Sequence, residues 1–183
     1  HSFGQEAMSA VDMARETVAK ELGADFREII FTGSATEANN LAVRGVVDKF
    51  WLDSFKSRGK RQDDFVPHII SGAIEHESVL NTLRYLESNG SARVTIFPVN
   101  KFGVVDVKKL KKELTESTIL VSVMLGNNEI GTIEPIKEIA EVIKEFRDSI
   151  GEQNVKTFSR SVRTVQRQSS GVLYPLLHTD ACQ

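Results

Sequence analysis

Near its carboxyl end the chain reads Val172-Leu173-Tyr174-Pro175-Leu176-Leu177, followed directly by His178-Thr179-Asp180-Ala181-Cys182-Gln183. A short apolar run of this kind is typical of a buried strand. It predicts that Asp180 lies at the carboxyl end of that strand, where open α/β sheets place their ligand chemistry. Because buried charges are normally paired, an acid at this position calls for a cationic partner.

Strand and helix patterns alternate along the rest of the chain. Apolar runs predict strands at residues 29–31, 68–71, 94–97 and 119–125. Apolar residues at three- and four-residue spacing predict helices at residues 3–22, 36–55, 78–86, 107–114 and 136–146, the first of them ending at Gly23. This order predicts an α/β fold in which helices cover both faces of a mostly parallel sheet.

Two polar segments interrupt the alternation. Residues 56–64 predict a solvated loop. Residues 156–171 carry four cations and no acid, and they lack a clear apolar period. For this second segment an exposed loop is favoured over a nucleic-acid surface, because Phe158 is the one aromatic residue there that could stack on a base.

Composition narrows the functional classes. Of 183 residues, 40% are hydrophobic, which suits a substantial core. With 23 basic against 25 acidic residues the net charge is −2, so no overall field favours nucleic acid or a membrane surface. The single cysteine, Cys182, excludes an intrachain disulfide and predicts a reducing compartment, the cytosol. No membrane span or signal peptide is visible, and the lack of an initiator Met suggests a fragment.

A candidate phosphate site precedes the second helix. Gly33 and Ser34 allow a tight turn, and either Ser34 or Thr36 could cap the helix. The backbone N–H groups of Ala35 and Thr36, with the Thr36 hydroxyl, could then donate to a phosphate. An ordinary helix cap would use the same residues, so the motif alone leaves both interpretations open.

Two further candidates follow strands. His76 comes after the strand at 68–71, where an imidazole could stack on a flat ring and exchange protons with a substrate. A hydrogen-bonded packing histidine is the alternative. Asn127 and Asn128 follow the strand at 119–125 and could donate to a phenolate or carboxylate, although a plain turn would also use them.

A phosphate site and an acid facing a protonated ring nitrogen together indicate pyridoxal phosphate (PLP). A zinc site of His178, Asp180 and Cys182, completed by His76, is a rival hypothesis. It is disfavoured because neighbouring residues on one face of a strand diverge from a single tetrahedral centre. A hydrolase built on Ser78, His76 and Asp180 lacks the Gly-x-Ser-x-Gly turn of that class.

Four motifs resemble, in order and spacing, the cysteine desulfurase and selenocysteine lyase branch of the class V aminotransferases. They are Phe31-Thr32-Gly33-Ser34-Ala35-Thr36-Glu37-Ala38-Asn39-Asn40, Glu75-His76-Glu77-Ser78-Val79, Asn127-Asn128-Glu129-Ile130-Gly131 and His178-Thr179-Asp180-Ala181-Cys182-Gln183. Gly33 and Ser34 stand in exchanged order relative to the family. Cys182 stands where the family usually has Ala, so it does not correspond to the family's catalytic cysteine.

The resemblance implies a PLP-dependent enzyme of fold type I. Residues 1–183 would form part of its large, cofactor-binding domain, incomplete at both ends, with 156–171 as an atypical loop. The implied cofactor contacts are Ala35 and Thr36 at the phosphate, His76 stacked on the ring, Asn127 and Gln183 near the phenolic oxygen, and Asp180 at the pyridinium nitrogen. His76 and Asp180 would be its catalytic residues, and no metal is implied.

The implied substrate is L-selenocysteine or L-cysteine, with L-alanine as one product. The polar insertion at 58–64 and the extended segment before His178 favour selenocysteine lyase, and cysteine desulfurase is the alternative. The full-length protein would be a homodimer that passes selenium or sulfur to an acceptor protein. The family's Schiff-base lysine and catalytic cysteine are expected beyond Gln183, so this chain alone would be inactive. A hypothesis of another class is a non-catalytic isoform that pairs with full-length subunits.

Overall fold

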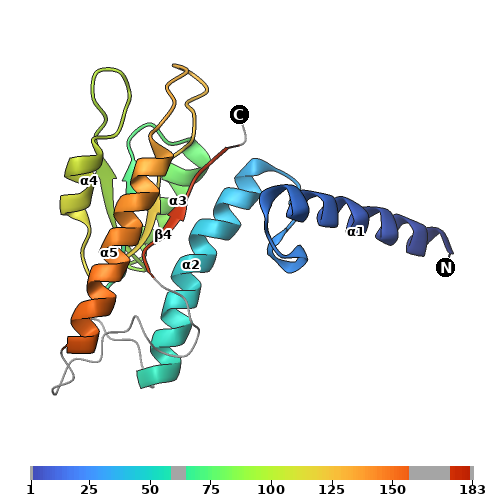
Figure 1. Cartoon of the computed structure of the whole chain (residues 1–183), viewed down its shortest axis with the longest axis horizontal. Helices are drawn as coiled ribbons and strands as arrows, with labels where there is room; N and C mark the ends of the chain where they lie inside the picture. Colours follow the sequence, from blue (N-terminus) through green and yellow to red (C-terminus); the bar gives the residue numbers. More distant parts are fainter. Residues whose placement is uncertain (1, 59–64, 157–173, 182–183) are drawn as a thin grey trace. The chain divides into compact units, whose positions relative to one another are not determined.

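The computed structural model describes residues 2–58, 65–156 and 174–181. Two compact units, His1–Ser34 and Ala35–Gln183, are described separately. The helices are α1 (Ser2–Leu22), α2 (Ala35–Arg58), α3 (Glu77–Ser88), α4 (Val107–Glu113) and α5 (Ile136–Lys156), with a short 3₁₀ helix, η1, at Phe26–Glu28 (Figure 1). The strands are β1 (His68–Gly72), β2 (Arg93–Phe97), β3 (Thr118–Ser122) and β4 (Leu176–His178).

The first unit holds α1, which ends before Gly23 as predicted. Gly23 has φ of +65°, a left-handed conformation that glycine adopts without strain and that commonly ends a helix. The strand predicted at residues 29–31 is wrong, because a strand needs a neighbouring strand to accept its hydrogen bonds and this unit contains none among its described residues. Instead, Arg15 donates to the Ile29 carbonyl (2.8 Å) and its guanidinium lies 5.3 Å from the centre of the Phe31 ring.

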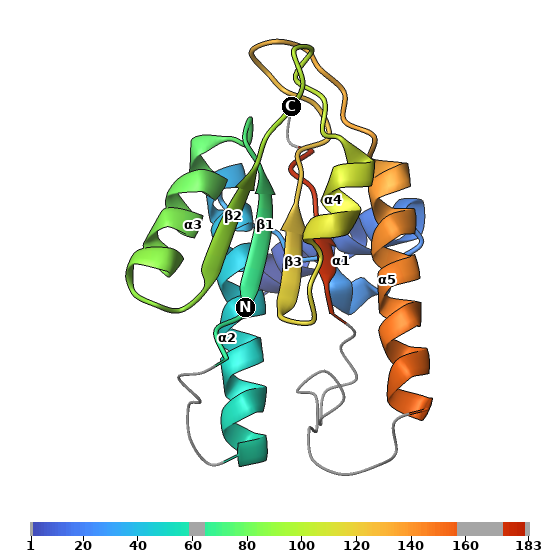
Figure 2. The same ribbon diagram turned by 90° about the vertical axis from the view of Figure 1, so that its left-hand side faces the viewer.

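The second unit is built on a four-stranded parallel sheet in the order β2-β1-β3-β4 (Figure 2). The predicted sheet is therefore confirmed. Strand β4 pairs with β3, with Leu177 opposite Val121 and His178 opposite Ser122. The apolar run before His178 thus places Asp180 just beyond the carboxyl end of the sheet, as predicted.

Alternation along the strands explains the two helical layers. Ile69 of β1 packs in the cluster that includes the apolar residues of α2 and α3. Ile70, its neighbour, packs in the cluster that includes those of α4 and α5. Helices therefore cover both faces of the sheet, and the strands are apolar on both sides, as in other buried parallel sheets.

Three predicted boundaries need correction. Helix α2 continues to Arg58, so residues 56–58 are helical rather than part of a loop, and residues 59–64 lie outside the described residues. Helix α5 continues to Lys156, and residues 157–171 of the predicted loop also lie outside. Strand β3 ends at Ser122, although the Leu125 amide still donates to the Asp180 carbonyl (2.9 Å).

No helix among the residues that the structure describes is long and apolar enough to cross a membrane.

Buried His68, at the amino end of β1, predicts acid sensitivity. Its Nδ1 lies 3.0 Å from Thr118 Oγ1 and its Nε2 lies 2.9 Å from Thr95 Oγ1. Burial, assisted by the positive charge of Arg93, lowers the pKa of His68 to about 4. An unfolded histidine has a pKa of about 6.5, so the unfolded state binds more protons between these values and folding stability falls as the pH falls.

The expected loss is about 3 kcal/mol between about pH 7.5 and about pH 4. Urea unfolding of the wild type and of His68→Gln at both pH values measures this loss. The variant lacks the titrating ring, so the pH dependence of all other groups cancels in the difference between the two proteins. The stability difference between the two proteins should shrink by about 3 kcal/mol at the acidic pH. A difference that does not change with pH would contradict the prediction.

Candidate functional site

The candidate phosphate segment begins α2. The first helical residue is Ala35, so Ser34 occupies the cap position and Thr36 lies inside the first turn. Thr36 is exposed, and its carbonyl accepts a hydrogen bond from the Asn40 side chain (2.9 Å). The N–H groups of this first turn have no carbonyl partner within the helix, which is the property that a phosphate site uses.

His76 lies at the junction between β1 and α3, as predicted, and it is the N-cap residue of α3. Its Nδ1 accepts from the Ser78 backbone N–H (3.1 Å) and lies 2.8 Å from Ser78 Oγ. The structure thus gives His76 a hydrogen-bonded capping role at an exposed position, rather than the packing role that the sequence left open. It occupies only Nδ1, so the exposed ring can still act through its other nitrogen.

Asp180 is buried, with 4% of its surface exposed. One carboxylate oxygen accepts a hydrogen bond from Asn39 Nδ2 (2.9 Å), and the same amide nitrogen donates to Ser78 Oγ (2.9 Å). Asn39 thus connects α2, α3 and the segment after β4. Sequence reasoning gave Asn39 no role, although its spacing from Val43 and Val47 places it on the buried face of α2.

Asn127 ties the loop after β3 to the loop before α3. Its Nδ2 donates to the Ile74 carbonyl (2.9 Å), and its Oδ1 accepts from the backbone N–H groups of Glu129 (2.9 Å) and Ile130 (3.0 Å). The turn interpretation is therefore correct, and the same contacts place Asn127 beside the segment that carries His76. Its predicted contact with a cofactor oxygen stays a prediction.

Glu75 is a buried acid near the carboxyl edge of the sheet, and the sequence assigned it no role. Glu75 accepts a hydrogen bond from the Met124 backbone N–H, and its other carboxylate oxygen lies 3.5 Å from Ser122 Oγ. Burial raises the pKa of Glu75 to about 7, and the negative charges of Asp180 and Glu134 act in the same direction. Glu75 holds the loop before His76 against the end of β3.

The residues of the rival zinc and hydrolase sites make other contacts in the structure. His178 Nδ1 lies 2.8 Å from Ser122 Oγ, and burial lowers the pKa of His178 although Asp180 opposes the shift. Among the described residues no group of three His, Cys, Asp or Glu side chains could hold a metal ion. Cys182 and Gln183 lie outside these residues. For a hydrolase, Ser78 does meet His76, but Asp180 accepts from Asn39, and the ring nitrogen facing Ser78 is the one that caps α3.

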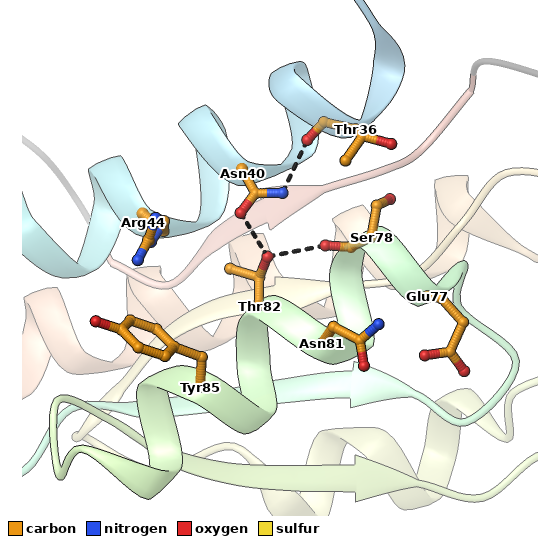
Figure 3. Close-up of a pocket in the computed structure, with 8 residues that line it drawn as sticks. All are labelled: Thr36, Asn40, Arg44, Glu77, Ser78, Asn81, Thr82 and Tyr85. Carbon is orange, nitrogen blue, oxygen red and sulfur yellow. Dashed lines mark hydrogen bonds between the residues drawn. The ribbon is translucent and has the colours of Figure 1, made fainter.

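A polar pocket of about 280 Å³ lies between α2 and α3 (Figure 3). It is lined by Thr36, Asn40, Arg44, Glu77, Ser78, Asn81, Thr82 and Tyr85. Asn40 accepts from the Thr82 hydroxyl (2.8 Å), and the Arg44 guanidinium lies 4.8 Å from the centre of the Tyr85 ring. Thr36 and Ser78 place this pocket beside the residues predicted to hold the cofactor.

A parallel sheet covered on both faces, with polar residues gathered beyond its carboxyl edge, defines an α/β protein whose candidate ligand site lies at that edge. The family model for class-V aminotransferases matches residues 1–150, and the chain belongs to this family. The family membership that the motifs implied is thus confirmed, and three of the four motifs lie within the matched residues.

Particular relatives sharpen the comparison. The chain is 48% identical over 145 residues to the mitosomal cysteine desulfurase of Trachipleistophora hominis, covering 79% of this chain and 30% of that protein. A solved NifS-like protein is 39% identical with a TM-score of 0.67, covering 79% of this chain and 36% of that one. The solved structure of SspA in complex with cysteine is 34% identical with a TM-score of 0.68, covering 80% and 38%.

This chain spans about a third of the length of the curated relatives that it matches. The fold type I architecture is confirmed by the structural matches. The residue roles predicted for this edge of the sheet remain predictions.

Proposed function

We propose that this chain forms the cofactor-binding part of a PLP-dependent enzyme that releases sulfur from L-cysteine and leaves L-alanine. The observation that carries the proposal is the convergence of Asn39 on Asp180 and Ser78, which gathers three of the four sequence motifs at one edge of the sheet. The names of the relatives support sulfur as the element released.

The residues present fit PLP. Asp180 is a buried carboxylate that lies beyond the carboxyl end of the sheet, and a protonated ring nitrogen is a partner of the charge that a buried carboxylate favours. The first turn of α2 offers the N–H groups of Ala35 and Thr36 and the Thr36 hydroxyl to a phosphate. The exposed ring of His76 is available for stacking.

Each residue has a limited task in this proposal. PLP, when bound, withdraws electrons from the substrate carbon and so permits cleavage of its bond to sulfur. Asp180 holds the ring nitrogen in its protonated form. His76 moves a proton to or from the substrate through Nε2, because Nδ1 is held by Ser78. Asn127 is our candidate donor near the phenolic oxygen, and Gln183 is a second candidate from the sequence motif.

Selenocysteine lyase, which the polar insertion and the extended segment before His178 favoured, is the second candidate. Alanine released from L-cysteine and from L-selenocysteine by the full-length enzyme distinguishes the two substrates. We further propose that the full-length enzyme is a homodimer that passes the released element to an acceptor protein. A chain that pairs with full-length subunits but releases no alanine would support the non-catalytic alternative.

Binding of the cofactor tests the site directly. Thr36→Ala should weaken PLP binding about tenfold or more, because a hydrogen bond to a charged group contributes about 1.5–3 kcal/mol. It should leave the binding of pyridoxal, which lacks the phosphate, unchanged. Equilibrium titration with PLP and, separately, with pyridoxal, each followed by the absorbance change of the added compound, measures both affinities.

Thr17→Ala on α1 is the matched control, because its hydroxyl donates only to the Met13 carbonyl of its own helix. It should bind both compounds like the wild type. Equal weakening of PLP and pyridoxal by Thr36→Ala would contradict the phosphate assignment, and the absence of saturable PLP binding would contradict the proposed function.

A further inference from the structure

We propose that Asn39 is a positioning residue that directs the Ser78 hydroxyl onto Nδ1 of His76 and so helps to keep the ring proton on Nε2. The inference rests on the proposed function for its catalytic meaning, but its structural content does not depend on a bound cofactor. The observation is one continuous chain of hydrogen bonds from Asp180 through Asn39 and Ser78 to His76, with each link between 2.8 and 2.9 Å.

At Asp180, donor and acceptor are fixed in this chain of hydrogen bonds. Ionised Asp180 can only accept hydrogen bonds, so the amide group of Asn39 must turn its nitrogen toward the carboxylate. The second hydrogen of that nitrogen points at Ser78 Oγ. Asn39 thereby supplies a donor to each of two partners from different parts of the fold.

The donor and acceptor roles at Ser78 follow from those at Asn39. Its hydroxyl accepts from Asn39 and has a single hydrogen of its own to donate. The ring nitrogen Nδ1 of His76 lies 2.8 Å away and also receives the Ser78 backbone N–H. Nδ1 is therefore an acceptor, and a neutral His76 carries its proton on Nε2, the nitrogen left to face a substrate.

Because Asn39 and Ser78 are buried, the loss of either hydrogen-bond partner is costly. Asn39 is 4% exposed and Ser78 is 9% exposed, so water does not readily replace a lost partner. A carboxyl group at position 39 would share one proton with Asp180, because two buried carboxylates this close do not both ionise, and its other oxygen would accept from Ser78 instead of donating to it. The Ser78 hydroxyl would then turn away from His76, and its oxygen would face Nδ1 as an acceptor.

The test is the tautomer of His76, read from its ring ¹⁵N shifts by NMR in the protein without cofactor, at a pH where the ring is neutral. The wild type should show the proton on Nε2. In Asn39→Asp the share of rings with the proton on Nδ1 should rise about three- to tenfold, because one hydrogen bond between neutral groups is lost at Nδ1. Ser78→Ala removes the same donor and should raise this share as well.

Asn40→Asp is the matched control. Asn40 is the next residue of α2, and its side chain contacts Thr36 and Thr82 rather than this chain of hydrogen bonds. It should leave the tautomer unchanged. An unchanged tautomer in Asn39→Asp, or in Ser78→Ala if the first variant does not fold, would overturn the inference. PLP titration of the wild type reports separately on the proposed function.

Discussion

Asp180→Asn should lower turnover of the full-length enzyme about a thousandfold, while PLP remains bound. An amide cannot hold the positive charge on the ring nitrogen, so the substrate carbon loses the electron withdrawal that its cleavage needs. Losing one such charge interaction in a buried site costs about 4 kcal/mol of transition-state stabilisation. Because Asp180 is buried beside Asn39, water cannot substitute for the missing carboxylate.

Steady-state alanine release and PLP content, measured on the same preparation, check this expectation. Asp48→Asn is a suitable control, since it makes the same chemical change at an exposed position of α2. Turnover of the Asp180 variant within a few-fold of the wild type would refute the role assigned to Asp180. Loss of folding would show as a changed circular dichroism spectrum, and Asp180→Glu, which keeps the charge but shifts its position, would then replace the first variant.

Leu83→Ala should destabilise the second unit by about 2–5 kcal/mol. Leu83 of α3 is fully buried in the cluster that also contains the apolar residues of α2 and Ile69 of β1. Truncation removes buried apolar surface and leaves a cavity that rigid neighbours fill only in part. The same packing holds Asn39 of α2 against Ser78 of α3, so the loss would also loosen the candidate site.

Denaturant unfolding of the wild type and the variant measures the effect. Leu41→Ala is the matched control, because Leu41 is also helical but half of its surface is exposed. Its cost should stay below about 1 kcal/mol. Equal losses in the two variants would mean that the cluster between α2 and α3 does not carry the stability assigned to it.

Local patterns were sufficient for the parallel sheet and for the placement of His76 and Asp180. Strand periodicity and helix periodicity arise from backbone geometry that acts over a few residues, so they can be seen in the sequence. The positions of His76 and Asp180 follow from the same reasoning, because each lies a few residues beyond the end of an apolar strand, at the carboxyl edge of the sheet.

Long-range partners were not predictable in this way. The strand expected at residues 29–31 has the right composition, but strand formation depends on a neighbouring strand, and residues 2–34 as described contain none. Helices α2 and α5 extend past their expected ends because the residues that extend them are mostly polar, and polar residues carry no apolar periodicity. Glu75 received no role from the sequence, and only the structure shows that it is a buried acid in contact with Met124.

Sequence alone therefore determined the fold class, the family and the order of the elements in the second unit, because these depend on repeated local patterns and on four ordered motifs. Only the tertiary structure decided how the motifs meet. Asn39 reaches Asp180 across 141 positions of the chain, and that contact exists because β4 inserts beside β3 and ends under the first turns of α2. The chain of hydrogen bonds that orients His76 is a product of that packing, and no local pattern encodes it.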